Sequence, residues 1–303
     1  MVLKVGVVEG ALKVVSPELD RLEYPEYKWS ERYVPMDGRR LPGVTAIDYY
    51  RLTRVGAWQL LADYANNVEK FEVLMEKVTY GAEYYGASIT YSSQEQDAID
   101  FSRTNGADIV VDITREKMDA VEEGWRQLKN RLFCKGQPGK NIWGMINHPD
   151  VMHAISPFRL GFATSPDNNL AVLSSMVDTI ITTTNEIEQP DTFIFPVRQV
   201  RELMLQRVGS TSDTSVMQYF LDNNGVINNI DTAVELAGAG PGGVDIAMAY
   251  RRDPRKVVGV VPKEKTQFGP PQYKGFNVEV YWDGQVSGVH FKRPFSCLIM
   301  ENV

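Results

Sequence analysis

The sequence has few of the residues that build metal, disulfide and nucleophilic sites. Its 303 residues include only two cysteines, Cys134 and Cys297, and three histidines. Two cysteines so far apart form neither a disulfide framework nor a CxxC metal motif. We expect both to be buried thiols in a reducing compartment, and we expect no cofactor.

Positive charge and long apolar runs are scarce as well. The chain has 32 Lys and Arg against 39 Asp and Glu, a net charge of -7, whereas proteins that read nucleic acids usually carry a basic face. No uncharged apolar run approaches the ~20 residues that cross a bilayer. The start of the chain, interrupted by Lys4 and Glu9, lacks a signal-peptide pattern. We expect a protein that stays in the cytosol or in an assembly formed there, without sequence-specific DNA binding and without a membrane.

What is present is the composition of a globular protein, with 43% apolar and 23% charged residues. Residues 14–42 contain four prolines and several aromatic residues but no sustained period. Proline favours extended backbone, and an irregular segment of this kind needs another surface to lie on. We therefore expect residues 1–44 to be an N-terminal arm.

The next segment is typical of a long hairpin. Residues 49–61 and 71–91 are both strand-like, and a polar tip at 62–70 separates them. A lone hairpin of this length is marginally stable in water. Either its own subunit or a neighbour has to cover it.

The clearest helix begins after Asp112 or Thr114 and ends at Gly136. Its apolar residues recur at spacings of three and four, which places them on one stripe: Met118, Val121, Trp125, Leu128 and Leu132. Gly136 stands where a left-handed cap is favoured. The spacing predicts about 20 helical residues, or about 30 Å.

Shorter elements follow. Ser165-Pro166 is a helix start signal, and the helical period continues to Ile187. We expect a buried strand at 192–195, helices to about 206 and over 214–223, and then strands at 232–236, 244–250, 257–261, 276–282 and 286–300, with Asp283-Gly284 as a hairpin turn. Helices and strands mix without βαβ alternation, so the predicted class is α+β.

Two motifs raise enzymatic alternatives. His148, Asp150 and His153 would suit a metal-dependent hydrolase, but Pro149 breaks any helix between the imidazoles and favours a structural turn. The glycines from Gly238 to Gly243 resemble a phosphate-binding loop only weakly. Pro241 has no backbone N–H to donate to a phosphate, and no Lys or Ser/Thr follows. A tight surface turn is the simpler interpretation. Catalytic and metal residues are therefore not expected.

Four segments, in this order, resemble the major capsid proteins of tailed bacteriophages of the Hong Kong 97 type, in the branch of encapsulin-like prophage capsid proteins. They are Gly56–Ala65, Asn130–Gly136, Trp143–Pro149 and Pro190–Pro196. The resemblance covers nearly the whole chain. It implies an arm at 1–44, an extended loop (E-loop) at 45–91, a peripheral domain at 92–169 and 261–303 with a spine helix at about 114–135, and an axial domain at 170–260.

The resemblance also implies a function. The chain is expected to be a structural subunit that assembles with copies of itself, as hexamers and pentamers, into an icosahedral phage head around double-stranded DNA. A separate scaffolding protein is expected because no long charged N-terminal extension is present, and a portal and a decoration protein are further expected partners. The alternative is an encapsulin-type compartment shell. The expected assembly or structural residues are Trp58, Asp63, Tyr64, Trp125, Asn147, His148, Pro149, Gly238, Gly240 and Gly243.

Overall fold

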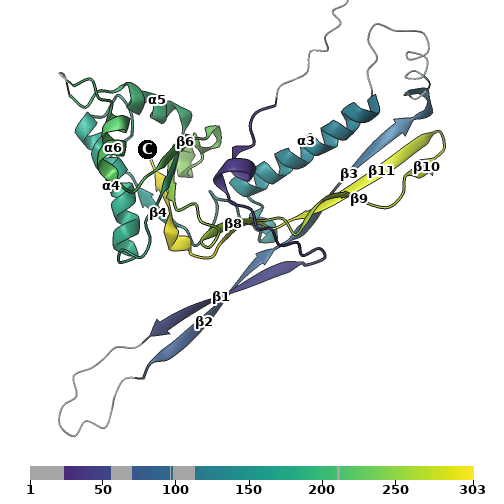
Figure 1. Cartoon of the computed structure of the whole chain (residues 1–303), viewed down its shortest axis with the longest axis horizontal. Coiled ribbons are helices and arrows are strands. Elements are labelled where there is room, and N and C mark those ends of the chain that lie inside the picture. The colour runs from purple at the N-terminus through teal and green to yellow at the C-terminus, as the bar shows by residue number, and fades with distance from the viewer. Residues whose placement is uncertain (1–23, 56–69, 96, 98–112, 210–211) are drawn as a thin grey trace, which may run out of the picture. The chain divides into compact units, whose positions relative to one another are not determined.

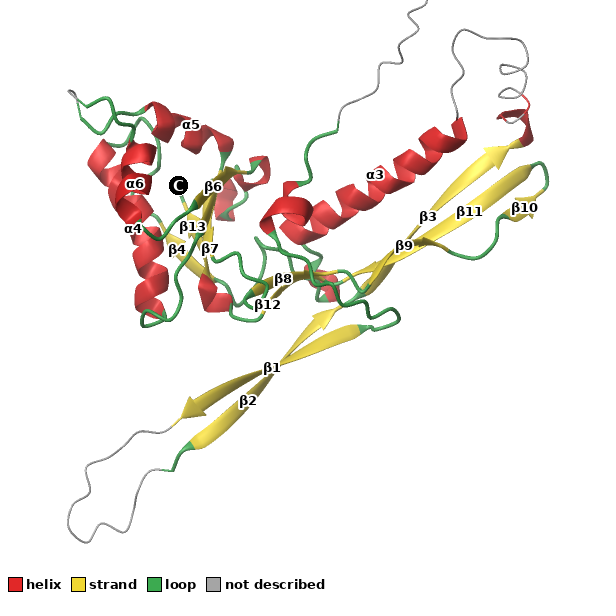
Figure 2. Cartoon of the chain, in the orientation of Figure 1, coloured by secondary structure: helices red, strands yellow, loops and turns green. Residues whose placement is uncertain are grey.

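The computed structural model describes residues 24–55, 70–95, 97, 113–209 and 212–303. It confirms an α+β mixture of helices and strands (Figures 1 and 2). The chain forms a larger unit of residues 27–86, 125–266 and 283–303, and a smaller unit that includes residues 87–124 and 267–282. Each is described by itself.

A mixed five-stranded sheet lies at the centre of the larger unit. Its order is β4 (Met152–Ile155), β13 (Cys297–Glu301), β7 (Ile246–Tyr250), β5 (Thr192–Phe195) and β6 (Asn229–Thr232). The outer pairs β4–β13 and β5–β6 are parallel, and β7 is antiparallel to both of its neighbours. Strands from both the predicted axial and the predicted peripheral segments thus share one sheet. The domain division itself remains a prediction.

Three helices belong to the apolar cluster on one face of this sheet: α4 (Pro166–Thr183), α5 (Val197–Leu205) and α6 (Val216–Asn224). Successive strand residues point to opposite faces. Accordingly Phe193 and Phe195 join the helices in this cluster, whereas Ile194 joins the cluster on the other face. The Ser165 hydroxyl accepts a hydrogen bond from the Asn168 amide and caps α4, as its sequence predicts.

The second cluster includes the C-terminal end of α3 (Ile113–Cys134) and the short helical turn Trp29–Tyr33. Trp29 and Tyr33 are fully buried, and the Tyr33 hydroxyl donates to the Thr232 carbonyl at 2.7 Å. The expectation that the aromatic residues of the arm need a foreign surface is therefore wrong for this part. Residues 1–23 lie outside the described residues.

A long hairpin is formed by β1 (Ala46–Val55) and β2 (Glu72–Gly81), paired antiparallel in register from Ala46 opposite Gly81 to Val55 opposite Glu72. A smaller antiparallel pair joins β8 (Val257–Val260) to β12 (Gly288–Phe291). Strands β3 (Glu83–Ser92), β9 (Lys263–Gln267), β10 (Gln272–Lys274) and β11 (Asn277–Val286) form another sheet.

Several predicted boundaries need correction. The strand predicted at 71–91 is two strands, because the chain leaves β2 at Gly81 and β3 pairs with β11 instead of β1. The α4 helix stops at Thr183 rather than Ile187, where Asn185 and Glu186 take positive φ. The strand predicted at 232–236 is β6 followed by a short 3-10 turn.

Asp283-Gly284 is not a hairpin turn, since β11 runs through it. Gly284 is there for another reason: a Cβ at this position would lie 2.4 Å from the Trp125 ring. A glycine that allows close approach was mistaken for a glycine that allows a turn.

Candidate assembly site

The outer half of the hairpin exposes apolar side chains on both faces. Cross-strand partners Leu52 and Met75 are 63% and 65% exposed, and Leu74, opposite Thr53, is exposed on the other face. Tyr50, Val55, Phe71 and Val73 are exposed as well. An apolar surface of this extent marks an interaction site in a soluble protein. We call Tyr50, Leu52, Val55, Phe71, Val73, Leu74 and Met75 the hairpin surface.

The root of the hairpin, in contrast, is buried and held by polar contacts. The Tyr80 ring stacks on His290, with ring centroids 4.1 Å apart, and meets the Tyr49 ring edge-on at 5.8 Å. The Tyr80 hydroxyl lies 3.0 Å from His148 Nε2 and donates to the Phe291 carbonyl at 3.2 Å. Tyr49 and Tyr80 therefore stabilise the root of the hairpin by aromatic packing.

The two buried histidines have complete hydrogen bonding when neutral. His148 Nδ1 accepts from the Asp150 amide at 3.2 Å, so its proton lies on Nε2 and points to Tyr80. His290 Nε2 lies 2.8 Å from the Ser287 hydroxyl, which itself donates to the Gly81 carbonyl. Both rings link the hairpin root to the body of the larger unit.

Burial lowers the pKa of His148 to about 4, although the Asp150 carboxylate opposes the shift. Burial likewise lowers the pKa of His290 to about 3. Burial raises the pKa of the Tyr80 hydroxyl to about 12. The root is thus an uncharged polar cluster at neutral pH.

Arg51 adds a charged contact beside this cluster. Its guanidinium donates to the Asp150 carboxylate at 3.0 Å and to the Phe291 carbonyl at 3.1 Å. The arginine therefore ties β1 to the turn that follows Pro149 and to the end of β12. Because the pair is partly exposed, it fixes geometry more than it adds stability.

Asn147 closes the C-terminal end of α3. Its side-chain amide donates to the Lys135 carbonyl at 2.9 Å, while the backbone amides of Met145 and Ile146 donate to the Phe133 and Cys134 carbonyls. These bonds satisfy carbonyls that a helix end leaves unpaired. Gly136 takes φ +63°, as its position at the helix end predicts. Pro149 is exposed in a turn, also as predicted.

Trp125 is buried, as the apolar stripe predicts, and its indole donates to Glu264 at 2.7 Å. The stripe is not buried throughout, since Met118 is exposed.

Cys134 and Cys297 are buried thiols, as predicted, and burial raises the pKa of Cys134 to about 12.

The Gly238–Gly243 segment is a turn between two strands rather than a phosphate loop. Gly238 and Gly243 have positive φ, and the Gly238 amide donates to Asp245 at 2.8 Å. Gly240 serves close packing, because a Cβ there would lie 2.8 Å from the side chains of Val244 and Ile246. Trp58, Asp63 and Tyr64 lie outside the described residues.

The three residues of the hydrolase alternative have separate partners. His148 contacts Tyr80, Asp150 pairs with Arg51, and His153 lies 3.1 Å from Glu301. Within the described ranges, no three His, Cys, Asp or Glu residues come together in a way that would hold a metal. No helix in those ranges has the length and apolar character to cross a membrane.

Two buried groups escaped the sequence interpretation, namely His290 and Glu188. Glu188 accepts from Lys256 and, at 2.9 Å, from Arg293. The charged partners of Glu188 and the Tyr80 ring that stacks on His290 lie far away in sequence. The run of basic residues at 251–256, which the sequence analysis did not single out, is the one local signal that could have pointed to a buried acidic partner.

Several solved capsid structures share this fold. The chain matches the capsid of Myoviridae phage XM1 with a TM-score of 0.82 and 14% identity, covering 100% of this chain and 99% of that one. It matches the capsid of a native GTA particle with a TM-score of 0.66 and 10% identity, covering 99% of each chain. It matches a chain of Mycobacterium phage Ogopogo with a TM-score of 0.59 and 15% identity, again covering 99% of each chain. A search of curated proteins by sequence finds no match.

The fold is thus the Hong Kong 97-type capsid fold. The family model for the major capsid protein matches residues 56–302, and the chain belongs to this family. It is a shell subunit of an icosahedral phage head and part of the virion. The comparisons do not favour the compartment-shell alternative.

Proposed function

We propose that the subunit assembles as hexamers and pentamers in which the hairpin surface lies on a neighbouring subunit. The observation that carries this proposal is the contrast within one hairpin. Its root is locked by Tyr80, His148 and His290, whereas its outer half exposes apolar residues on both faces. A two-stranded ribbon exposed in this way is stable only if something covers it.

The expected partners follow from the same proposal. The shell encloses double-stranded DNA without reading its sequence, assembles in the host cytoplasm with a separate scaffolding protein, and carries a portal and a decoration protein. The subunit acts without catalysis and without a cofactor. The separate partners of His148, Asp150 and His153 support this, because each group is already engaged in holding the fold.

The hairpin surface is tested by the double substitution Leu52→Ser and Met75→Ser. Both side chains are exposed in the subunit, so the subunit should keep its melting temperature. Shell yield should fall at least tenfold, as judged by electron microscopy and sedimentation. The matched control is Thr53→Ser with Glu76→Gln on the same two strands, which should assemble normally. Normal shells from the Leu52 and Met75 variant would overturn the proposal.

A further inference from the structure

A basic strip stands out in this acidic chain. The segments 251–256 and 292–293 hold six basic residues and a single carboxylate, that of Asp253, although the net charge of the chain is -7. The basic residues of the strip are Arg251, Arg252, Arg255, Lys256, Lys292 and Arg293.

Backbone hydrogen bonds hold the two segments together. The amides of Lys292 and Arg293 both donate to the Lys256 carbonyl, at 2.8 and 3.3 Å, and Lys292 Nζ donates to the Pro254 carbonyl at 3.0 Å. The Asp253 side chain accepts from the Arg255 amide at 2.8 Å and closes the turn. The strip is therefore a built feature of the fold and not a chance meeting of flexible side chains.

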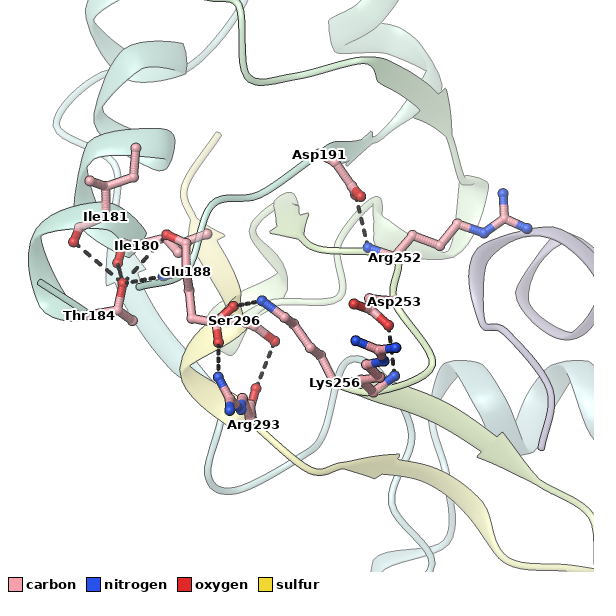
Figure 3. A network of polar contacts seen from close by, with 11 residues as sticks. Ile180, Ile181, Thr184, Glu188, Asp191, Arg252, Asp253, Lys256, Arg293 and Ser296 are labelled. Atoms are coloured by element: carbon pink, nitrogen blue, oxygen red, sulfur yellow. Dashed lines mark hydrogen bonds and ion pairs between the residues drawn. The ribbon is translucent and has the colours of Figure 1, made fainter. Parts of the chain in front are cut away.

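Two of the six basic side chains share one buried carboxylate, which offsets a single positive charge. Figure 3 shows Lys256 and Arg293 on either side of the buried Glu188 carboxylate, which pairs with both. This pairing anchors the strip to the segment that follows α4. It also removes Glu188 as a partner for the remaining basic residues.

The other four basic side chains lie outside this pairing, although the Lys292 charge helps to lower the pKa of the Asp37 carboxylate. Within the part of the chain that the structure describes, Arg251, Arg252, Arg255 and Lys292 form no ion pair. Arg252 and Arg255 are exposed, and Arg252 points away from the Glu188 network in Figure 3. Some exposed arginines elsewhere are paired, such as Arg39 with Asp37 and Arg198 with Glu202.

We propose that this strip contacts the phosphate backbone of the packaged duplex DNA, an inference that rests on the proposed function of a DNA-filled shell. Guanidinium groups match phosphate oxygens with two parallel hydrogen bonds. Phosphate contacts carry no sequence information, which suits a shell that accepts any genome. Between Arg251 and Arg255 the only apolar residue is Pro254, whereas a protein partner usually requires a buried apolar anchor.

The strip is tested by the salt dependence of duplex binding. Full-length subunits are titrated with a fluorescent 30-base-pair duplex between roughly 20 and 200 mM salt. Four phosphate contacts predict a slope of about -3.6 when the logarithm of the binding constant is plotted against the logarithm of the salt concentration. The variant Arg252→Ala with Arg255→Ala should reduce the size of this slope by about 1.8. The control Arg39→Ala with Arg198→Ala removes the same charge from paired positions and should leave the slope unchanged.

Several outcomes would overturn the inference. The first is that the subunit does not bind the duplex at low salt. The second is that the salt slope is unchanged in the Arg252 and Arg255 variant. The third is that the control variant loses as much of the slope. Polyglutamate serves as a second probe, standing for an acidic protein segment. If the Arg252 and Arg255 variant loses polyglutamate binding but still binds the duplex, the strip recognises an acidic protein segment instead. Arg252→Lys with Arg255→Lys should keep the slope, which shows that an effect of the alanine variant reflects charge and not misfolding.

Shell formation is scored separately for the same proteins. The Arg252 and Arg255 variant should form shells in normal yield. If wild-type subunits form no shells under any condition, the proposed function fails, while the duplex titration still decides the strip.

Discussion

At the scale of single residues, burial explains the low pKa of His148, because it disfavours the charged imidazolium. The hydrogen bonds of the ring fit this neutral state: Nδ1 accepts from the Asp150 amide, so a proton added there would face another N–H group. The folded subunit therefore binds this proton only near pH 4, whereas an unfolded chain binds it near pH 6.5.

The stability of the subunit should accordingly fall in mild acid. Between about pH 6.5 and pH 4 the unfolded chain binds more protons, so the stabilisation present above pH 6.5 is lost as the pH falls through this window. The loss at pH 4 should be on the order of 3 kcal/mol for each buried histidine, since one pKa unit corresponds to about 1.4 kcal/mol. Urea unfolding at pH 7.0, 5.5 and 4.5 measures it.

The matched variants for this prediction are His148→Gln and His153→Gln. His148→Gln removes one titrating group, so the free energy of unfolding should fall less between pH 7.0 and pH 4.5. The variant should also be somewhat less stable than the wild type at pH 7. The exposed His153, paired with Glu301, is the control and should leave the acid loss as it is. An equal acid loss in the His148 variant would contradict the assignment. A tightly bound transition metal in the wild type, lost when both histidines are replaced, would instead revive the hydrolase alternative.

Trp125 and Gly284 should behave as one packing unit. Trp125→Ala should cost about 3 to 5 kcal/mol because it leaves a cavity and frees Glu264. Gly284→Ala should cost about 1 to 3 kcal/mol because its Cβ would lie 2.4 Å from the indole. The double variant should be less destabilised than the sum, as measured by urea unfolding. Strict additivity would show that the two sites are independent.

At the scale of elements, one glycine in the middle of α3 and another just past its end have opposite roles. Gly124 is exposed with nothing within 4 Å of a Cβ, so Gly124→Ala should stabilise the subunit by about 0.5 to 1 kcal/mol. Gly136 has φ +63°, and its Cβ would lie 2.5 Å from the Gly144 amide nitrogen, so Gly136→Ala should destabilise it. Thermal unfolding of the two variants should show shifts of opposite sign.

Elements with local signals were predictable from the sequence. The Ser165 cap, the Gly136 terminus and the stripe ending at Leu132 all act within a few residues, and the helices begin and end close to the predicted places. Trp29 and the Asp283-Gly284 pair were misread because their surroundings come from distant segments. The contact of Tyr80 with Phe291 spans 211 residues and leaves no local pattern.

The same limit applies to the assembly site. The hairpin and its need for cover were visible in the sequence, and so was the turn at Pro149. Which part of the hairpin is locked and which part is exposed depends on His290 and Ser287, more than 200 residues away. Sequence alone therefore predicted a hairpin but not its division into a root and an exposed surface.

At the scale of the whole molecule, the subunit completes its own core but leaves the hairpin surface uncovered. Burying that surface against a neighbour links assembly to stability by mass action. Subunits within shells should therefore unfold at a higher temperature than free subunits. The Leu52→Ser and Met75→Ser variant should lose this gain while the free subunit is unaffected.

Deleting residues 62–70 tests the hairpin as a whole. The described residues build two core clusters among themselves, so we expect the shortened chain to fold and keep the melting temperature of the free subunit. Shells should nevertheless fail to form or fall apart on dilution, because the hairpin is expected to make its contacts between subunits. Calorimetry of the free subunit and electron microscopy of the expressed protein measure the two effects independently. Normal particles from the deletion would show that residues 62–70 take no part in assembly, and a subunit that no longer folds would place them in the core instead.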